Sequence, residues 1–197
     1  MPAAASFERK IENRVLEMDP RVKLATVWLG GCSGCHMSFL DQDERLIDLS
    51  AKVSVVYGPF VDAKEYPEGV DVCLVEGAVA TEEHRELIQK IRERTRILVS
   101  FGDCAVTGNV TALRNPLGTA EPTLKRAYLE NVTLKPGVPA ERGVVPVLLD
   151  KVLPVHHVVK VDAFLPGCPP PAGLIHFVLS ELVEGRHPDL AGKLKYG

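Results

Sequence analysis

Four of the five cysteines have a spacing that could bind a metal ion or a metal cluster. Cys32 and Cys35 form a CxxC pair in GGCSGC, Cys104 lies in FGDC and Cys168 lies in LPGCPP. Thiolates are preferred ligands of zinc and of iron–sulfur clusters. Structural zinc usually takes close cysteine pairs, whereas here two distant single cysteines join one pair. The spacing therefore favours an iron–sulfur cluster. Cys73 lies inside an apolar run and is expected to be a small buried residue.

Strands and helices are predicted to alternate along the chain around these cysteines. Apolar runs rich in β-branched residues predict five strands, at 22–29, 53–57, 70–75, 96–101 and 158–165. Helices are predicted at 36–50, after an N-cap at Thr81, and at 172–184. Continuously apolar strands are typical of a sheet covered on both faces. The sequence thus predicts an α/β fold: a flavodoxin-like, doubly wound, mostly parallel sheet with a loop-rich C-terminal half.

This fold would bring the four cysteines to one place. The carboxyl ends of parallel strands share one edge, and ligand sites form in the loops beyond it. Cys32 and Cys35 follow the first predicted strand, Cys104 the fourth and Cys168 the fifth. A cubane cluster accepts such a spread, because each of its irons takes one thiolate. Glycines precede three of these cysteines and would let the backbone approach a bulky cluster.

The rest of the chain predicts one domain with an appended segment. Four apolar residues spaced about one helical turn apart predict an N-terminal helical extension within residues 1–20. A single flavodoxin-like iron–sulfur domain is expected over 21–197. Five prolines make 105–146 look like loops around one short helix near 123–130, and 147–153 is expected to form one or two helical turns.

Composition excludes several classes of protein. The chain has 197 residues, 46% of them hydrophobic and 25% charged, which is ordinary for a globular protein. No run approaches the ~20 apolar residues of a membrane span. The net charge of −3 gives no basic surplus for binding nucleic acid. The N-terminus does not resemble a secretory signal, and an odd number of cysteines is typical of a reducing compartment. We expect a cytoplasmic protein with no membrane span.

Four motifs, in order, resemble the small subunits of [NiFe]-hydrogenases: GCSGCHMSFLD, VEG, GDCAVTGNV and FLPGCPP. The stretches SFLDQDERLIDL and DVCLVEG are most similar to the cytoplasmic, NAD-linked bidirectional group. The resemblance spans about residues 22–187. It implies that Cys32, Cys35, Cys104 and Cys168 hold one [4Fe–4S] cluster, proximal to the nickel–iron centre of a separate large subunit.

The same resemblance implies an electron-transfer role in a hydrogen:NAD⁺ oxidoreductase. Hydrogen would be oxidised or evolved in the large subunit, and electrons would pass through this chain to diaphorase subunits that carry FMN and further iron–sulfur clusters. This chain has no second CxxC pair for a nickel–iron centre of its own. It also lacks the C-terminal cysteine-rich region of longer small subunits, so one cluster is expected.

Glu76 is the carboxylate most suggestive of function, because it ends the third predicted strand on the cysteine edge. The resemblance implies an acid close to the cluster, active in proton transfer or in hydrogen bonding to a ligand loop. The alternative is a carboxylate satisfied by the backbone amides of the next turn. His36 is expected to begin a helix rather than to bond a sulfide. Five other polar residues are expected at the surface or under a partner: Asp41, Asp43, Glu44, His156 and His157.

Other interpretations remain open. A flavodoxin-like sheet invites FMN, but GGCSGC replaces the phosphate loop after the first strand, so FMN in this chain is disfavoured. An FMN-binding flavodoxin-type electron carrier with incidental cysteines is one alternative function, and a structural zinc protein is another. A cluster subunit of the respiratory complex I type shares the fold and the GCPP motif, but it carries adjacent cysteines where this chain has CSGC.

Overall fold

A five-stranded parallel sheet forms the centre of the molecule, which we describe from a computed structural model over residues 21–194. The predicted N-terminal helix lies outside these residues. The strands are β1 (Val22–Trp28), β2 (Val53–Tyr57), β3 (Val70–Glu76), β5 (Thr95–Phe101) and β7 (Ala163–Leu165). Their order is β2-β1-β3-β5-β7, and every pairing is parallel. This is the flavodoxin-like strand order, so the predicted fold class is confirmed.

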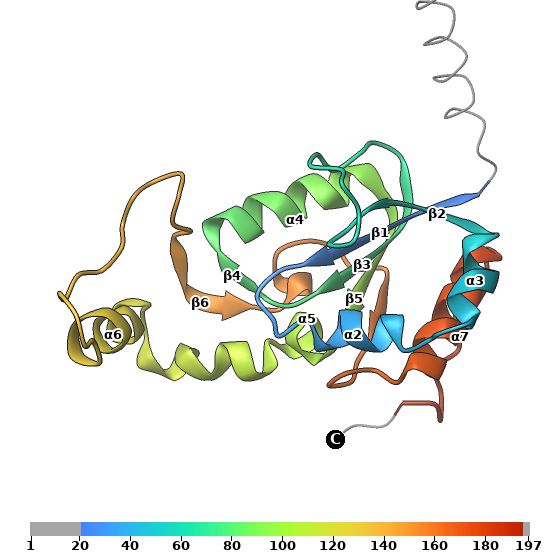
Figure 1. The fold of residues 1–197 in the computed structure, drawn as a ribbon. Helices are drawn as coiled ribbons and strands as arrows, with labels where there is room; N and C mark the ends of the chain where they lie inside the picture. The colour runs from blue at the N-terminus through green and yellow to red at the C-terminus, as the bar shows by residue number, and fades with distance from the viewer. Residues whose placement is uncertain (1–20, 195–197) are drawn as a thin grey trace, which may run out of the picture.

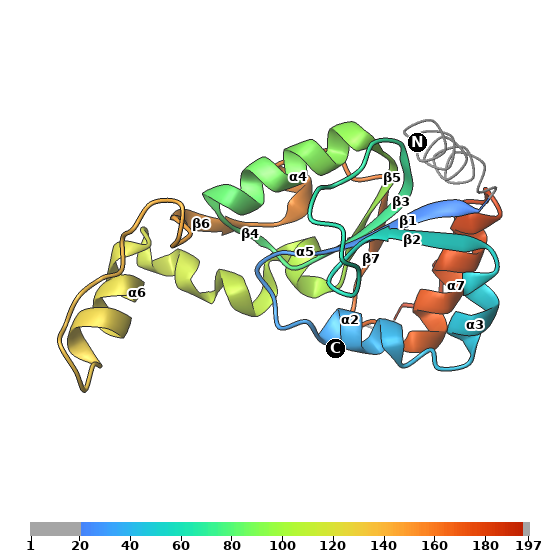
Figure 2. The same cartoon turned by 45° about the horizontal axis from the view of Figure 1, so that its top comes forward.

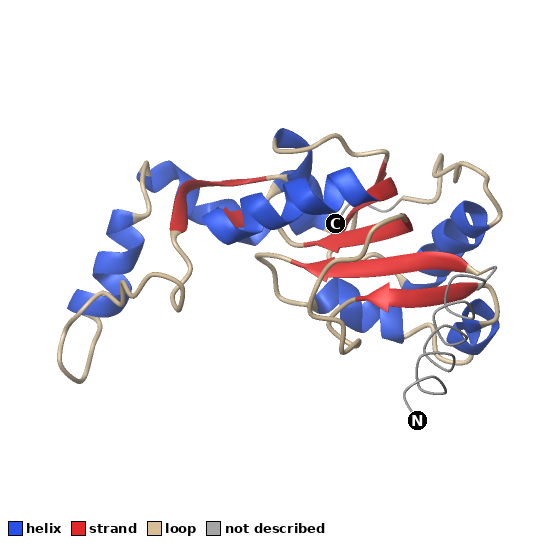
Figure 3. Cartoon of the chain, turned by 90° about the horizontal axis from the view of Figure 1, so that it is seen from above, coloured by secondary structure: helices blue, strands red, loops and turns tan. Residues whose placement is uncertain are grey.

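Helices cover both faces of the sheet (Figures 1 and 3). One face packs against α2 (Gly34–Leu40), α3 (Arg45–Ser50) and α7 (Ala172–Val183), and the other packs against α4 (Glu82–Arg94). Alternate strand residues serve the two faces: Leu24 and Leu74 pack on the first, Ala25 and Cys73 on the second. Both core clusters are apolar, which explains the continuously apolar strands. No helix in the described part of the chain is long and apolar enough to cross a membrane.

Four of the strands end level with one another at their carboxyl ends. Trp28 of β1 is aligned with Glu76 of β3, Glu76 with Phe101 of β5, and Phe101 with Leu165 of β7. The chain leaves the sheet within a few residues of each of these positions. The loops that carry the cysteines, which follow β1, β5 and β7, therefore start at the same edge of the sheet.

The prediction of a single helix over 36–50 is wrong, because a turn divides this segment into two helices. Helix α2 ends at Leu40 and α3 begins at Arg45. Asp43 between them has a φ of 50°, a left-handed conformation that cannot continue a right-handed helix. The buried Gln42 side chain donates to the Phe39 carbonyl at 2.9 Å and closes the turn. Asp41, Asp43 and Glu44 are exposed, as expected, but lie in this turn rather than on a helix face.

The segment after β5 projects from one end of the sheet (Figures 1 and 2). It contains more helix than predicted: α5 (Asp103–Thr107), the 3-10 helix η1 (Asn109–Leu117), α6 (Glu121–Lys125) and the π-helical turn η2 (Arg126–Glu130). The last two occupy the place of the short helix predicted near 123–130.

The helical turns predicted over 147–153 are wrong, because this segment forms strand β6 (Leu148–Leu153). It pairs antiparallel with the short strand β4 (Val79–Thr81), which was not predicted. Asn115 holds β6 from the other side: its Oδ1 accepts from Val152 N at 2.8 Å and its Nδ2 donates to Val152 O at 2.9 Å. Distant partners thus decide the conformation here.

The fifth predicted strand, 158–165, is regular only over its last three residues, in β7. Before it, Val155–His157 forms the 3-10 helix η3, and His156 and His157 are exposed as expected. The Asp162 carboxylate accepts from Leu98 N at 2.9 Å. Just before β7 begins, the Leu98 N–H is thus bonded to a side chain rather than to a strand carbonyl.

Candidate cluster site

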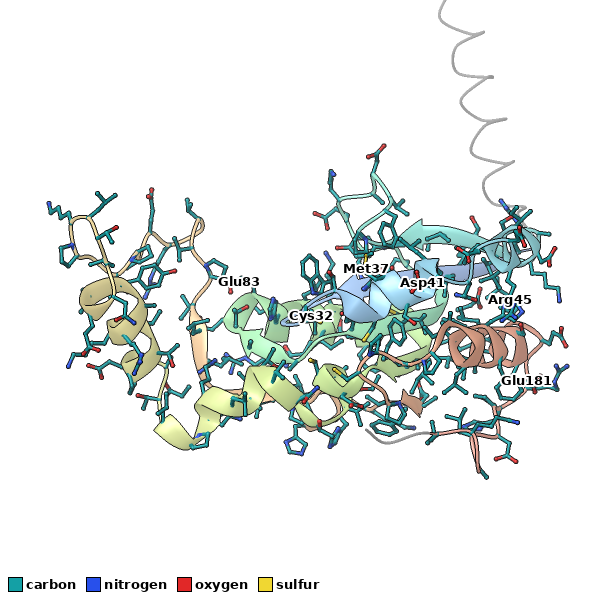
Figure 4. All side chains as sticks on the ribbon, turned by 60° about the horizontal axis from the view of Figure 1, so that its bottom comes forward. Cys32, Met37, Asp41, Arg45, Glu83 and Glu181 are labelled. Carbon is teal, nitrogen blue, oxygen red and sulfur yellow. The ribbon has the colours of Figure 1, made fainter. Side chains whose placement is uncertain are left out.

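The four predicted cysteines all lie at the carboxyl edge of the sheet. Cys32 precedes α2, Cys35 lies in its first turn, Cys104 lies in α5, and Cys168 follows β7. Figure 4 shows Cys32 beside the start of α2, with Met37 further along the helix and Asp41 just after its end. Cys35 and Cys104 are only 7% and 8% exposed, whereas Cys32 and Cys168 lie at the surface. The site therefore has a buried side and an open side.

Electrostatics indicate that these thiols are neighbours. Burial raises the pKa of the Cys35 thiol far above its ordinary range, and the charges of Glu76 and the other three thiols raise it further. Burial, Cys32 and Cys168 likewise raise the pKa of Cys104. Thiolates gathered in a low dielectric repel one another, so cationic iron is the kind of group that would stabilise them while displacing their protons. Among residues 21–194, no three His, Cys, Asp or Glu side chains are placed to hold one metal ion.

Gly102 provides the cradle against which Cys35 lies. Its φ of 82° and ψ of 161° fall in a region that essentially only glycine adopts. A Cβ at this position would lie 2.1 Å from Cys35 Sγ, so the missing side chain makes room for the thiol. This glycine was not predicted to matter; the glycines expected to matter were those preceding the cysteines. Of these, Gly34 does contact a thiol, because its N–H donates to Cys32 Sγ at 3.4 Å.

Asp103 ties two of the cysteine-bearing loops together. Its N–H donates to the Gly167 carbonyl at 2.9 Å, and its Oδ1 accepts from the Gly167 N–H at 2.7 Å. Asn109 Nδ2 also donates to Cys168 Sγ at 3.5 Å. These contacts fix the Cys104 and Cys168 loops relative to each other. Neither residue was predicted from the sequence, although Asp103 stands directly before Cys104 in the FGDC motif.

Glu76 hydrogen-bonds the loop that carries Cys35. The residue is 1% exposed. Its Oε1 accepts from Cys35 N at 3.3 Å, and its Oε2 accepts from His36 N at 3.0 Å and also contacts His36 Nδ1. Backbone amides therefore satisfy the carboxylate, and they belong to a cysteine-bearing turn. His36 does lie in the first turn of α2, but no local pattern indicated its side-chain contact with Glu76.

Cys73 lies away from this edge, in the middle of β3, and is 0% exposed. The pKa of its thiol is raised to about 12, because the effect of burial outweighs the opposing effect of a hydrogen bond from Tyr66. A buried thiol that stays protonated is chemically inert.

We therefore expect Cys73→Ala to leave the metal content of the protein unchanged and to cost about 1 kcal/mol of folding stability through lost packing. Iron analysis and thermal unfolding of the variant complex test this. Loss of iron from the Cys73 variant would contradict the assignment of the other four cysteines.

Exposed apolar side chains lie within a few residues of the cysteine-bearing segments and of Asn109. Trp28 at the end of β1 is 48% exposed, Met37 on α2 is 59% exposed, and Val110, next to Asn109, is 55% exposed. Large apolar side chains that gather at the surface are typical of an interaction site. This edge of the molecule is suited to contact another protein.

Comparison with known proteins connects this geometry to a family. Residues 32–182 match the family of the NADH ubiquinone oxidoreductase 20 Kd subunit. The NAD-reducing hydrogenase HoxS subunit delta of Cupriavidus necator is 42% identical over 177 residues, which cover 88% of this chain and 84% of that protein. A chain in the crystal structure of an NAD⁺-reducing [NiFe]-hydrogenase superposes with a TM-score of 0.85 at 39% identity, covering 90% of this chain and 99% of that one. The chain belongs to the small subunits of NAD-linked [NiFe]-hydrogenases.

More distant relatives are longer than this small subunit. A subunit of the F420-non-reducing hydrogenase of Methanocaldococcus jannaschii is 38% identical over 175 residues, which cover 88% of this chain but 60% of that protein. This chain therefore spans about three fifths of that protein. The family takes its name from a complex I-type subunit, but these relatives are hydrogenase subunits, in agreement with the CSGC spacing.

Proposed function

We propose that this small subunit carries one [4Fe–4S] cluster on Cys32, Cys35, Cys104 and Cys168. The observation that supports it most is that the three cysteine-bearing loops leave strands that end level at one edge of the sheet, with Cys35 Sγ lying against Gly102, two residues before Cys104. When bound, such a cluster accepts and donates single electrons. The four cysteines would supply its thiolates, and Gly102 would leave room for the Cys35 thiol.

The subunit would relay electrons between a large subunit and an NAD-reducing module. The C. necator relative is named a subunit of an NAD-reducing hydrogenase, and an Archaeoglobus profundus relative, 28% identical, is named an iron-sulfur subunit. The apolar surface around the cysteine edge suits a large subunit that holds the nickel–iron centre. Diaphorase subunits carrying FMN and further clusters would pass the electrons to NAD⁺. The iron–sulfur domain would span residues 21–197, and the complex would work in the cytoplasm.

An ultraviolet–visible spectrum of the chain co-purified with its large subunit tests the cofactor. We expect a broad shoulder in the blue that dithionite bleaches, together with acid-labile sulfide and an equal amount of iron beyond the iron of the nickel–iron centre. Resolved flavin bands without iron would support the FMN carrier instead. A colourless protein containing zinc would support the structural zinc protein.

The chain expressed alone is expected to be poorly soluble and to lose its cluster in air. Obligate interfaces are large, often above about 2,000 Å² in total, and apolar at their centre. Without a partner, the surface around Trp28, Met37 and Val110 stays exposed. Co-expression with the large subunit should rescue both properties, as measured by soluble yield and iron content. A soluble monomer that keeps its cluster in air would contradict an obligate subunit.

For Glu76, we propose that it holds the Cys35 turn, the role its hydrogen bonds support. Both of its oxygens act as acceptors, and the amide of glutamine offers only one. Glu76→Gln should therefore bind iron several-fold less stably, with hydrogen/deuterium exchange per loaded complex unchanged. Iron analysis and mass-spectrometric H/D exchange test this. Full iron content with reduced exchange would instead assign proton transfer to Glu76.

A further inference from the structure

His36 is a buried side chain beside a proposed ligand, yet it is not itself a ligand. The residue is 2% exposed, and its ring packs edge-on against Phe60 and Phe101, with centroids 5.8 and 6.2 Å away. Nδ1 contacts Glu76 Oε2, whereas the buried Nε2 has no hydrogen-bond partner among the described residues. The polar contact of this ring is thus made through Nδ1.

The Glu76 carboxylate is the other half of this arrangement. It receives the backbone N–H groups of Cys35 and His36, which lie in the first turn of α2 and would otherwise lack a helical acceptor. A glutamate side chain has several rotatable bonds, so holding its carboxylate in one place costs conformational entropy. The buried ring of His36 packs against two aromatic rings and can supply that restraint.

The geometry points to His36 as a positioning residue: its Nδ1 holds the Glu76 carboxylate where it accepts the Cys35 N–H, and so fixes the turn that presents the Cys35 thiol. The inference rests on the proposed function, because the turn matters only if Cys35 binds the cluster. Partners that orient metal ligands typically contribute about 10- to 100-fold to metal retention.

Three variants of the co-purified complex separate this role from simple packing. In His36→Asn, the side-chain amide nitrogen is two bonds from Cβ, as Nδ1 is. In His36→Gln, it is three bonds from Cβ, as Nε2 is. His36→Ala removes both. Glutamine fills the space better than asparagine, so a packing role alone would favour His36→Gln.

The readout is the half-life of the EPR signal of this cluster during incubation of the dithionite-reduced complex with an iron chelator. The signal is identified as the one that Cys104→Ala abolishes. We expect half-lives about 10- to 100-fold shorter for His36→Ala and His36→Gln, and close to wild type for His36→Asn.

Equal half-lives in all four proteins, or better retention in His36→Gln than in His36→Asn, would overturn the positioning role. If Cys104→Ala abolishes no signal at all, the proposed function itself fails, which is a distinguishable result.

Discussion

Cys104→Ala is expected to remove the cluster and to abolish hydrogen-dependent NAD⁺ reduction by the complex. The residue is 8% exposed, and the charges of Cys32 and Cys168 act on its thiol. In the proposed site, its loss would leave one iron without a protein ligand. Mutation of a residue that only orients a metal ligand typically lowers metal affinity or activity by about 10- to 100-fold. Loss of a ligand itself should therefore lower activity by roughly 100-fold or more. The measurement is NAD⁺ reduction under hydrogen, together with the iron and sulfide content of the complex.

Cys73→Ala is the matched control, because it removes the same group from a buried strand position away from the site. Cys32→Ala, Cys35→Ala and Cys168→Ala should behave like Cys104→Ala. If Cys104→Ala retains both iron and activity, the four-cysteine site is wrong.

Gly102→Ala should damage the site almost as severely without removing any ligand. The new Cβ would lie 2.1 Å from Cys35 Sγ, far inside van der Waals contact. The backbone conformation of Gly102 also costs roughly 1–3 kcal/mol for a residue with a side chain. Cys35 must therefore move, and we expect loss of most iron from the small subunit with the chain still folded. Iron analysis and circular dichroism measure the two effects.

Gly118→Ala is the control for backbone strain. Gly118 also has a positive φ, 89°, but a Cβ there would meet no atom within 4 Å. The control should keep its iron and lose only stability. If the two variants lose iron equally, strain rather than contact with Cys35 explains the effect.

The sheet could be predicted from the sequence because its strands are continuously apolar. The runs that became β1, β3 and β5 are buried on both faces, so local composition and tertiary environment agree. Strand β6 was missed because Asp150 and Lys151 interrupt its apolar run, and its conformation depends on β4 and Asn115. The break after α2 depends on a single left-handed residue, Asp43.

Only those residues of the site whose type itself indicates metal binding could be predicted from the sequence. Cysteines are rare, and their positions after strands identified the ligand candidates directly. Gly102, Asp103 and His36 act through residues that are distant in sequence: Gly102 through Cys35, Asp103 through Gly167, and His36 through Glu76. No local pattern records such contacts. These contacts can be recognised only in the folded structure, where the level strand ends bring the residues together.

The most direct test of the account is an iron-edge anomalous difference map from crystals of this chain with its large subunit. We predict one compact iron peak at the carboxyl edge of the sheet, bounded by the Sγ atoms of Cys32, Cys35, Cys104 and Cys168, with Cys73 remote from it. An edge without iron, or a single peak that appears at the zinc edge instead, would contradict the central claim that these four cysteines hold an iron–sulfur cluster.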